Sequence, residues 1–290
     1  MPMQLQDAQV TIVGLGLMGG SLAAALITRG ACRRVVGVAR RQETIAQALA
    51  MGVIHEGTCQ VYEGVKNADI VVLATPVLTI VQLIEEIGPW LPPDCLLTDM
   101  GSTKQAVVQA MQALPPHVQP IGGHPMCGKE VAGLAAADAA LFRDAVYVLT
   151  PLARTSDAAI ALAQDLVRGV GAQPLLLDPM RHDLLVAAVS HLPYLLAVAL
   201  VATNESLADN AVWQLAATGF RDTTRLAASD ETMMLHILLS NQIGIRPMLA
   251  RFQEQLAHLD NLLESGDEAG LRAAIVAAAC RRRRLFPCPR

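Results

Sequence analysis

The chain has 290 residues, a mass of 30.8 kDa and 53% hydrophobic residues, which is enough for two domains with cores of their own. Charged residues make up only 17% of the sequence and the mean hydropathy is +0.39, so the composition excludes a disordered chain. The formal net charge is −4 and the pI is near 6.0, which leaves no general attraction to DNA, RNA or anionic lipid. We therefore expect no nucleic acid partner.

The six cysteines are scattered without a Cys-x-x-Cys pair and no secretory leader precedes them, so we expect reduced thiols and a cytoplasmic protein. Two uncharged stretches, Ala8–Thr28 and Leu184–Asn204, are long enough to span a membrane. The first is rich in glycine, which is typical of a loop between a strand and a helix. The second has Ser190, His191 and Pro193 at its centre, where lipid penalises unpaired polar groups. We expect core or interface helices and no membrane.

Short β-rich runs alternate with longer segments rich in Ala and Leu from Asp7 to about Leu177. This alternation is typical of parallel βαβ units, so we interpret residues 1–177 as an α/β Rossmann-type domain with a doubly wound sheet. The predicted strands are Gln9–Val13, Arg34–Val38, Ile70–Leu73, Leu96–Thr98, Val118–Ile121, Val146–Leu149 and Gln173–Leu176. The intervening helices are predicted to begin near Leu17, Gln42, Val77, Thr103 and Ser156.

The strand signals stop after Asp178, and the rest of the chain is predicted to be helical. The predicted helices are Pro179–Thr203, Ala208–Leu215, Glu231–Leu263 and Asp267–Arg284, with a loop over Gly219–Thr224. An apolar helical half with so few charges is expected to bury its excess surface against a second copy of itself. We therefore interpret residues 178–290 as an all-helical dimerisation domain and expect a homodimer. The run Arg281–Arg284 is interpreted as a solvated helix end.

A glycine loop follows the first predicted strand and begins the first predicted helix. Its sequence, Gly14-Leu15-Gly16-Leu17-Met18-Gly19, has the pattern G-x-G-x-x-G. In such a loop Gly14 permits the tight turn, Gly16 lets the backbone approach a pyrophosphate, and Gly19 allows close packing of helix on strand. The loop therefore predicts a dinucleotide site rather than a glycine turn that binds nothing.

The end of the second predicted strand bears on the type of dinucleotide. It has the sequence Gly37-Val38-Ala39-Arg40-Arg41, without the carboxylate that would hydrogen-bond the ribose 2′-hydroxyl of NAD. An arginine at this point can pair with a 2′-phosphate through two parallel hydrogen bonds. We therefore predict NADP, with NAD less favoured. The alternative is that Arg40 and Arg41 form only a solvated helix start.

Two more segments follow predicted strands at the same edge of the sheet. Thr75 and Pro76 come directly after the third strand and are expected to line the dinucleotide. Ser102 follows the next strand and has two interpretations. It either caps a helix or uses its hydroxyl to orient a base or to bind a substrate.

His124 lies between glycines after the fifth predicted strand, in the segment Gly122–Glu130. Because histidine titrates near neutrality, it can accept a proton from a hydroxyl group while hydride leaves the same carbon. A metal site built from His124, Cys127 and Glu130 is disfavoured, since no second ligand pair with zinc spacing accompanies them.

The helical half contributes two further candidates. His191 stands beside Pro193 in an apolar stretch, and a buried histidine there needs a polar partner. Arg225 has two open interpretations: it pairs with Asp222, or it binds a carboxylate delivered from the facing domain.

Together these segments resemble the prephenate/arogenate dehydrogenase family of tyrosine biosynthesis, from Val10 to about Asn241. The matching stretches are Val13–Gly19, Asp99–Lys104, Gly122–Gly128, Ser190–Pro193 and Gly219–Arg225. The resemblance implies a Rossmann domain, a helical substrate and dimerisation domain, and an active site between them. It implies the oxidative decarboxylation of arogenate or prephenate, in which hydride passes to the nicotinamide while the ring carboxylate leaves as CO2.

The resemblance also implies roles by position. His124 would be the hydrogen-bond acceptor and base for the 4-hydroxyl group, and Ser102 would support both of them. His191 would contact the substrate, Arg225 would hold a substrate carboxylate, and Glu130 matches an acidic position near the pocket entrance in some members. Because no regulatory or mutase segment is recognised, we expect a monofunctional enzyme.

Two alternatives remain, a β-hydroxyacid-type NADP-dependent dehydrogenase and a non-catalytic NADP-binding sensor. The β-hydroxyacid enzymes have a similar glycine loop but use a lysine in their second domain, and the last lysine of this chain is Lys129. A sensor would bind the cofactor without turnover. The sequence does not decide between arogenate and prephenate, although the expected use of NADP gives arogenate a slight edge.

Overall fold

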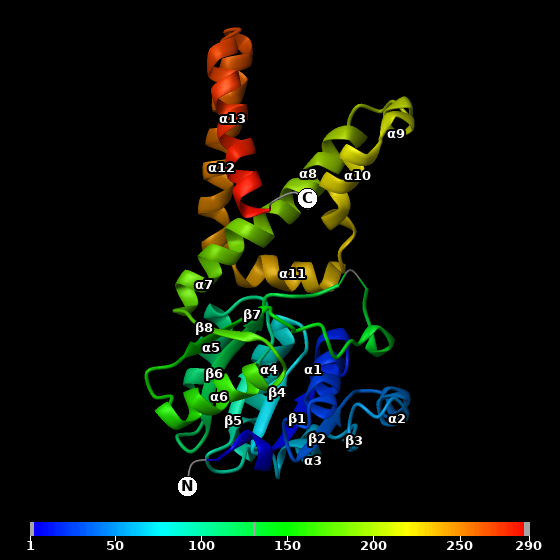
Figure 1. The fold of residues 1–290 in the computed structure, drawn as a ribbon, viewed down its shortest axis with the longest axis vertical. Helices are drawn as coiled ribbons and strands as arrows, with labels where there is room; N and C mark the ends of the chain where they lie inside the picture. The colour runs from blue at the N-terminus through cyan, green and yellow to red at the C-terminus, as the bar shows by residue number, and fades with distance from the viewer. Residues whose placement is uncertain (1–2, 130, 287–290) are drawn as a thin grey trace. The chain divides into compact units, whose positions relative to one another are not determined.

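The computed structural model describes residues 3–129 and 131–286, which form two compact units that meet in sequence at Gly244 and Ile245. The first unit contains a twisted eight-stranded sheet with helices on both faces, followed by further helices (Figure 1). The predicted fold class, a Rossmann-type doubly wound sheet followed by helices, is confirmed.

The strand order places β1 at the point where the direction of winding reverses. The order is β3-β2-β1-β4-β5-β6-β7-β8. The strands are β1 (Gln9–Val13), β2 (Arg34–Val38), β3 (Glu56–Thr58), β4 (Ile70–Leu73), β5 (Leu96–Asp99), β6 (Gln119–Pro125), β7 (Val146–Pro151) and β8 (Gln173–Leu176). Because β2 and β4 flank β1 and all three run parallel, a crevice for a ligand is expected at the carboxyl ends of β1 and β4.

The sheet differs from the predicted parallel series at two points. The sequence pattern missed β3, which has only three residues, one of them a glycine. In addition, β7 runs antiparallel to β6. The chain between them, residues 126–145, has only the 3₁₀ turn η3 (Leu134–Ala136) among its described residues, and a parallel connection needs a longer crossover.

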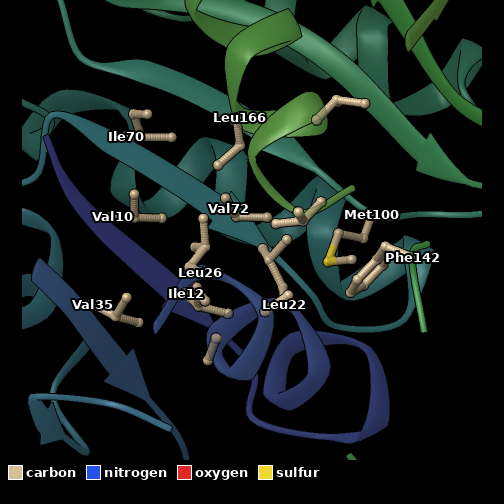
Figure 2. Close-up of a cluster of buried hydrophobic side chains, with 14 of the residues drawn as sticks. Val10, Ile12, Leu22, Leu26, Val35, Ile70, Val72, Met100, Phe142 and Leu166 are labelled. Carbon is tan, nitrogen blue, oxygen red and sulfur yellow. The ribbon is translucent and has the colours of Figure 1, made fainter. Parts of the chain in front are cut away.

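Alternating side chains of the central strands build two cores, one on each face of the sheet. Val10 and Ile12 of β1 face a cluster with α1 (Leu17–Thr28) and α6 (Asp157–Gly169), as Figure 2 shows. The opposite face carries α3 (Val61–Val65), α4 (Val77–Ile87) and α5 (Gln105–Gln112). This alternation follows from the two-residue period of a strand. The shorter elements here are η1 (Leu5–Asp7), α2 (Gln42–Ala50) and η2 (Gly88–Trp90).

The helices after the sheet match the prediction in part. They are α7 (Pro179–Val186), the π turn η4 (Ala187–His191), α8 (Leu192–Glu205), α9 (Ala211–Leu215), α10 (Thr218–Thr224), η5 (Arg225–Ala228) and α11 (Glu231–Ser240). The loop predicted over Gly219–Thr224 is wrong, because this segment is α10. The hydroxyls of Thr223 and Thr224 donate to carbonyls four residues earlier, which satisfies them within a helix. The long helix predicted over Glu231–Leu263 is interrupted at Asn241, whose φ of −124° and ψ of 33° leave the helical region.

By length and composition alone, Pro179–Glu205 is the one helix among the described residues that could cross a membrane. The second unit contains most of α12 (Gln242–Glu264) and all of α13 (Glu268–Leu285). These two helices are joined at Gly266, which has a φ of +63°, and the side chain of Asp267 caps α13 by accepting from the N–H of Gly270.

Candidate active site

The glycine loop lies where the strand order reverses, between β1 and the start of α1. Gly14 has a φ of +105°, and a Cβ atom there would lie 2.6 Å from the carbonyl oxygen of Ala74. A Cβ on Gly19 would lie 1.9 Å from the carbonyl oxygen of Gly14. In contrast, a Cβ on Gly16 would meet no atom within 4 Å. Packing within the chain therefore requires the first and third glycines, whereas the second borders open space that a ligand can occupy.

The surroundings of this loop fit a dinucleotide. Gly16 is the N-cap residue of α1, and no side chain in the described part of the protein caps the helix, so its first N–H groups are available to an anion. Thr75 contacts the loop, and its buried hydroxyl has no hydrogen-bond partner among the residues described. Pro76 is exposed at the N-cap position of α4.

The remaining loop and strand-end residues differ in what they can offer a ligand. The side chain of Leu15 is buried in the core, so only its backbone can face a ligand, whereas Leu17 and Met18 are half-buried in the first turn of α1. Arg40 and Arg41 are exposed after β2, and neither forms an ion pair with any residue that the structure describes.

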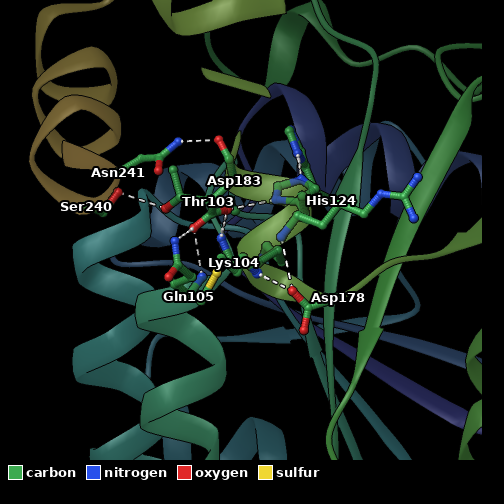
Figure 3. A network of polar contacts seen from close by, with 12 residues as sticks. Thr103, Lys104, Gln105, His124, Asp178, Asp183, Ser240 and Asn241 are labelled. Carbon is green, nitrogen blue, oxygen red and sulfur yellow. Dashed lines mark hydrogen bonds and ion pairs between the residues drawn. The ribbon is translucent and has the colours of Figure 1, made fainter. Parts of the chain in front are cut away.

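A buried carboxylate, Asp183 of α7, joins the helices to the edge of the sheet (Figure 3). Its Oδ1 accepts from the backbone N–H of Lys104 at 2.7 Å, and its Oδ2 accepts from the backbone N–H of Gln105 at 2.9 Å. The possible Ser102 cap is therefore wrong, since α5 begins at Gln105, close to the predicted start near Thr103, and Asp183 accepts from the N–H groups at this end. A short side-chain contact between Thr103 and Ser240 of α11, 2.7 Å between the hydroxyl oxygens, ties the same turn to another helix.

His124, near the end of β6, contacts a second histidine. Its Nδ1 lies 2.9 Å from Nε2 of His182, and the two rings meet edge to face with 5.1 Å between their centroids. The pKa of His124 is held well below 6.5, mainly by burial and further by His182, the Lys104 ammonium and His191. His124 is therefore a neutral imidazole at neutral pH, and the residue as a whole is half-buried.

His191, the last residue of the π turn, is buried and also has a polar partner. The amide nitrogen Nδ2 of Asn241 lies 3.1 Å from Nδ1 of His191 and donates to the carbonyl oxygen of Asp183 at 2.7 Å. Burial lowers the pKa of His191 to about 4, so this ring is neutral as well. The π turn occurs just before Pro193, which has no N–H to donate to the preceding turn.

A buried ion pair lies beneath these histidines. The carboxylate of Asp99 accepts from the N–H groups of Gly101 and Gly123, at 2.7 and 2.8 Å, and from the ammonium group of Lys104. Neither side chain of the pair has exposed surface. This pair therefore joins the ends of β5 and β6 and holds the strand that carries His124.

Five residues of this network were not predicted from the sequence, namely Asp99, Lys104, His182, Asp183 and Asn241. The adjacent His182 and Asp183, in the first turns of a helix and followed by an apolar stretch, were the available signal, because buried polar groups require partners. Of the predicted residues, Ser102 is half-buried in the turn between β5 and α5. Arg225 is exposed at the start of η5, which packs beside α8. Glu130 lies outside the described residues.

This fold, with its glycine loop at the switch point of the sheet, defines a dinucleotide-binding protein of the Rossmann class. Residues 22–176 match the prephenate dehydrogenase nucleotide-binding domain, and residues 178–276 match the prephenate dehydrogenase dimerization domain. The chain therefore belongs to the prephenate dehydrogenase family, a family of oxidoreductases. The resemblance predicted from the five motifs is confirmed, and the β-hydroxyacid alternative is set aside.

Individual relatives are similar over nearly the whole chain. Prephenate dehydrogenase of Bacillus subtilis (strain 168) is 38% identical over 265 residues, which are 89% of this chain and 70% of the relative. The crystal structure of prephenate dehydrogenase from A. aeolicus, in complex with hydroxyphenyl propionate and NAD+, has 30% identity and a TM-score of 0.90, covering 98% of this chain and 99% of that one. Synechocystis arogenate dehydrogenase has 29% identity and a TM-score of 0.81, covering 96% and 100%.

Proposed function

We propose that this protein catalyses the oxidative decarboxylation of arogenate or prephenate in tyrosine biosynthesis, with a nicotinamide dinucleotide as hydride acceptor. The observation that carries the proposal is the neutral imidazole of His124, a half-buried residue on a strand beside the dinucleotide edge of the sheet. Membership of the prephenate dehydrogenase family supports the reaction class.

In this reaction His124 would accept the proton of the 4-hydroxyl group through Nε2, the ring nitrogen that does not face His182. As hydride leaves the carbon that bears the hydroxyl, positive charge develops there and the hydroxyl proton becomes strongly acidic. A weakly basic, neutral imidazole is therefore sufficient. Since formation of the aromatic ring supplies the driving force, the protein has mainly to align the reacting carbon and polarise one hydroxyl.

The other predicted residues take supporting roles in this proposal. Ser102 would hydrogen-bond the hydroxyl and His124. His191 would donate to the substrate from Nε2, because its Nδ1 faces the amide nitrogen of Asn241. Arg225 would hold a carboxylate of the substrate, and Glu130 would lie near the entrance of the site.

The loop Gly14–Gly19, with Thr75 and Pro76, would hold the dinucleotide. We propose NADP over NAD because Arg40 and Arg41 follow β2, where NAD-binding proteins place a carboxylate. The A. aeolicus relative was crystallised with NAD+, so the preference needs a direct test. We expect Arg40→Asp to reverse or abolish the NADP preference in kcat/KM. An unchanged NADP/NAD ratio would refute the phosphate assignment.

The substrate can be identified in the same assay, by following the absorbance of the reduced nicotinamide with arogenate and with prephenate, each paired with NADP and with NAD. We expect the fastest rate with arogenate and NADP. We also expect His124→Asn to reduce kcat by about 10²–10⁴-fold while KM and cofactor affinity change little. No turnover of any pair by the wild-type protein would instead support a non-catalytic NADP-binding sensor.

We further propose that residues 178–290 form the substrate and dimerisation domain of a cytoplasmic homodimer. Large apolar side chains are exposed along Pro179–Glu205 in the single chain, among them Leu184, Leu185, Val189 and Val198. We propose that a second copy of the chain covers this apolar surface. The alternative partner for such a surface is a membrane. Light scattering in detergent-free buffer should give twice 30.8 kDa. A monomer, or a protein that needs detergent, would contradict this proposal.

A further inference from the structure

We propose that His182 and Asp183 are positioning residues that hold His124 in the tautomer with hydrogen on Nδ1, leaving the Nε2 lone pair for the substrate. The inference deepens the proposed function and rests on the role of His124 as the base. It is carried by a chain of hydrogen bonds that runs from the backbone of α5 through Asp183 and His182 to His124.

The chain of bonds starts at groups whose direction is fixed. The backbone N–H groups of Lys104 and Gln105 can only donate, and each points at one oxygen of Asp183. Both oxygens therefore act as acceptors, as they do in a carboxylate. Burial alone would raise the pKa of Asp183, but the hydrogen bonds from His182, Gln105 and Lys104 outweigh it, so the pKa lies below its ordinary value.

The direction of the remaining bonds follows from this acceptor. Nδ1 of His182 lies 2.8 Å from Oδ1 of Asp183, so Nδ1 must carry the hydrogen. A neutral His182 then has only a lone pair on Nε2, and Nδ1 of His124, at 2.9 Å, must supply the hydrogen between the two rings. Nε2 of His124 is therefore the acceptor that a base requires.

One other arrangement conflicts with this geometry, and a second conflicts with the role of His124 as the base. If His124 carried its hydrogen on Nε2, two lone pairs would face each other across 2.9 Å. If His182 were an imidazolium, it would donate from both nitrogens and force His124 into that same unproductive tautomer. A neutral His182, held by Asp183, is thus required for His124 to act as a base.

Two substitutions of His182 separate positioning from packing. His182→Leu fills the space without an acceptor, whereas the side-chain oxygen of His182→Gln can still accept from Nδ1 of His124. We expect His182→Leu to lower kcat by about 10- to 100-fold, with KM and cofactor affinity changed less than about twofold. His182→Gln should recover most of the loss, and equal losses in the two variants would refute the proposal.

The double variant adds a stricter test. In a His124→Asn background there is no base to orient, so His182→Leu should cause no further loss of kcat. A loss of the same size in both backgrounds would show that His182 acts through the fold and would overturn the proposal.

A measurement without turnover distinguishes this proposal from the proposed function. Nitrogen-15 NMR of histidine-labelled protein reports which ring nitrogen carries hydrogen, and the signals missing in His124→Asn assign His124. We expect a protonated Nδ1 and a bare Nε2 in the resting wild type, with this preference lost in His182→Leu. The opposite tautomer in an active enzyme would refute the positioning role. The expected tautomer in a protein that oxidises neither arogenate nor prephenate would refute the proposed function.

Discussion

The buried ion pair between Lys104 and Asp99 allows a quantitative test of how the site is supported. Lys104→Met keeps an apolar stem of similar length but leaves the Asp99 carboxylate with only the N–H groups of Gly101 and Gly123. Removing one partner of a buried pair typically costs about 3–5 kcal/mol. Because two backbone donors remain, we expect the lower end, about 3 kcal/mol. For a unit of this size the loss corresponds to a fall of roughly 6–12 °C in the melting temperature.

The assay is urea unfolding of the protein at fixed concentration, with Lys66→Met as the matched control. Lys66 forms an exposed ion pair with Glu63 three residues away, so the same substitution there should leave the unfolding midpoint unchanged. A loss of less than about 1 kcal/mol for Lys104→Met would refute the supporting role of the pair, since it would then behave like a surface ion pair. In addition, loss of the ammonium charge should raise the pKa of His124 and move the acid limb of kcat/KM to higher pH.

Three further predictions concern the glycine loop, the packing of Gly244 and the protonation of His191. Gly16→Ala should leave stability unchanged and weaken the binding of NADP in a fluorescence titration. Gly14→Ala should also destabilise the fold, because Gly14 has a φ of +105°. Equal stability of the two variants would argue against the loop geometry. Gly244→Ala would place a Cβ 2.5 Å from Oδ1 of Asn241 and should destabilise by about 1–3 kcal/mol in thermal unfolding, and a neutral effect would contradict this packing. The pKa of His191 is about 4 in the folded protein, against an ordinary value of 6.5, so the unfolded state binds a proton first as the pH falls. The free energy of unfolding should therefore fall by about 3 kcal/mol between pH 6.5 and pH 4. His191→Gln should flatten this pH dependence, and an unchanged dependence would contradict the shift.

Local patterns were sufficient to predict much of the sheet and its glycine loop. The strands Gln9–Val13, Arg34–Val38, Ile70–Leu73 and Gln173–Leu176 have the predicted bounds. The first three are rich in β-branched residues, and turn or helix signals bound them all. The glycine loop was recognisable because its requirements are local, namely a positive φ at Gly14 and close packing at Gly19. The helix predicted to begin near Ser156 begins at Asp157, and the hydroxyl of Ser156 caps it by accepting from the N–H of Ala159.

The prediction failed where distant segments decide the structure. The start of α5 depends on Asp183, 79 residues away from Lys104, and no local signal shows that this carboxylate arrives there. His182, the partner of His124, is 58 residues away in the sequence. Motif spacing therefore could not predict that the two histidines are in contact. The antiparallel pairing of β7 with β6 depends on the path of the irregular residues 126–145 between them. This segment has no periodic pattern of apolar residues from which its path could be predicted. The role of Arg225 in holding a substrate carboxylate stays a prediction.

The chemistry at position 183 also explains why an aspartate is needed there. Its two oxygens accept from two backbone N–H groups, one imidazole and the side-chain amide of Gln105, so an asparagine would turn its NH2 group toward a donor whichever way it lay. A glutamate would extend one methylene further into a fully buried space. The same carboxylate therefore serves the start of α5 and the orientation of His182, and its replacement cannot separate folding from catalysis. Among the residues described, the ring of His182 forms hydrogen bonds only with Asp183 and His124. Substitutions of His182 can therefore separate the effect on folding from the effect on catalysis.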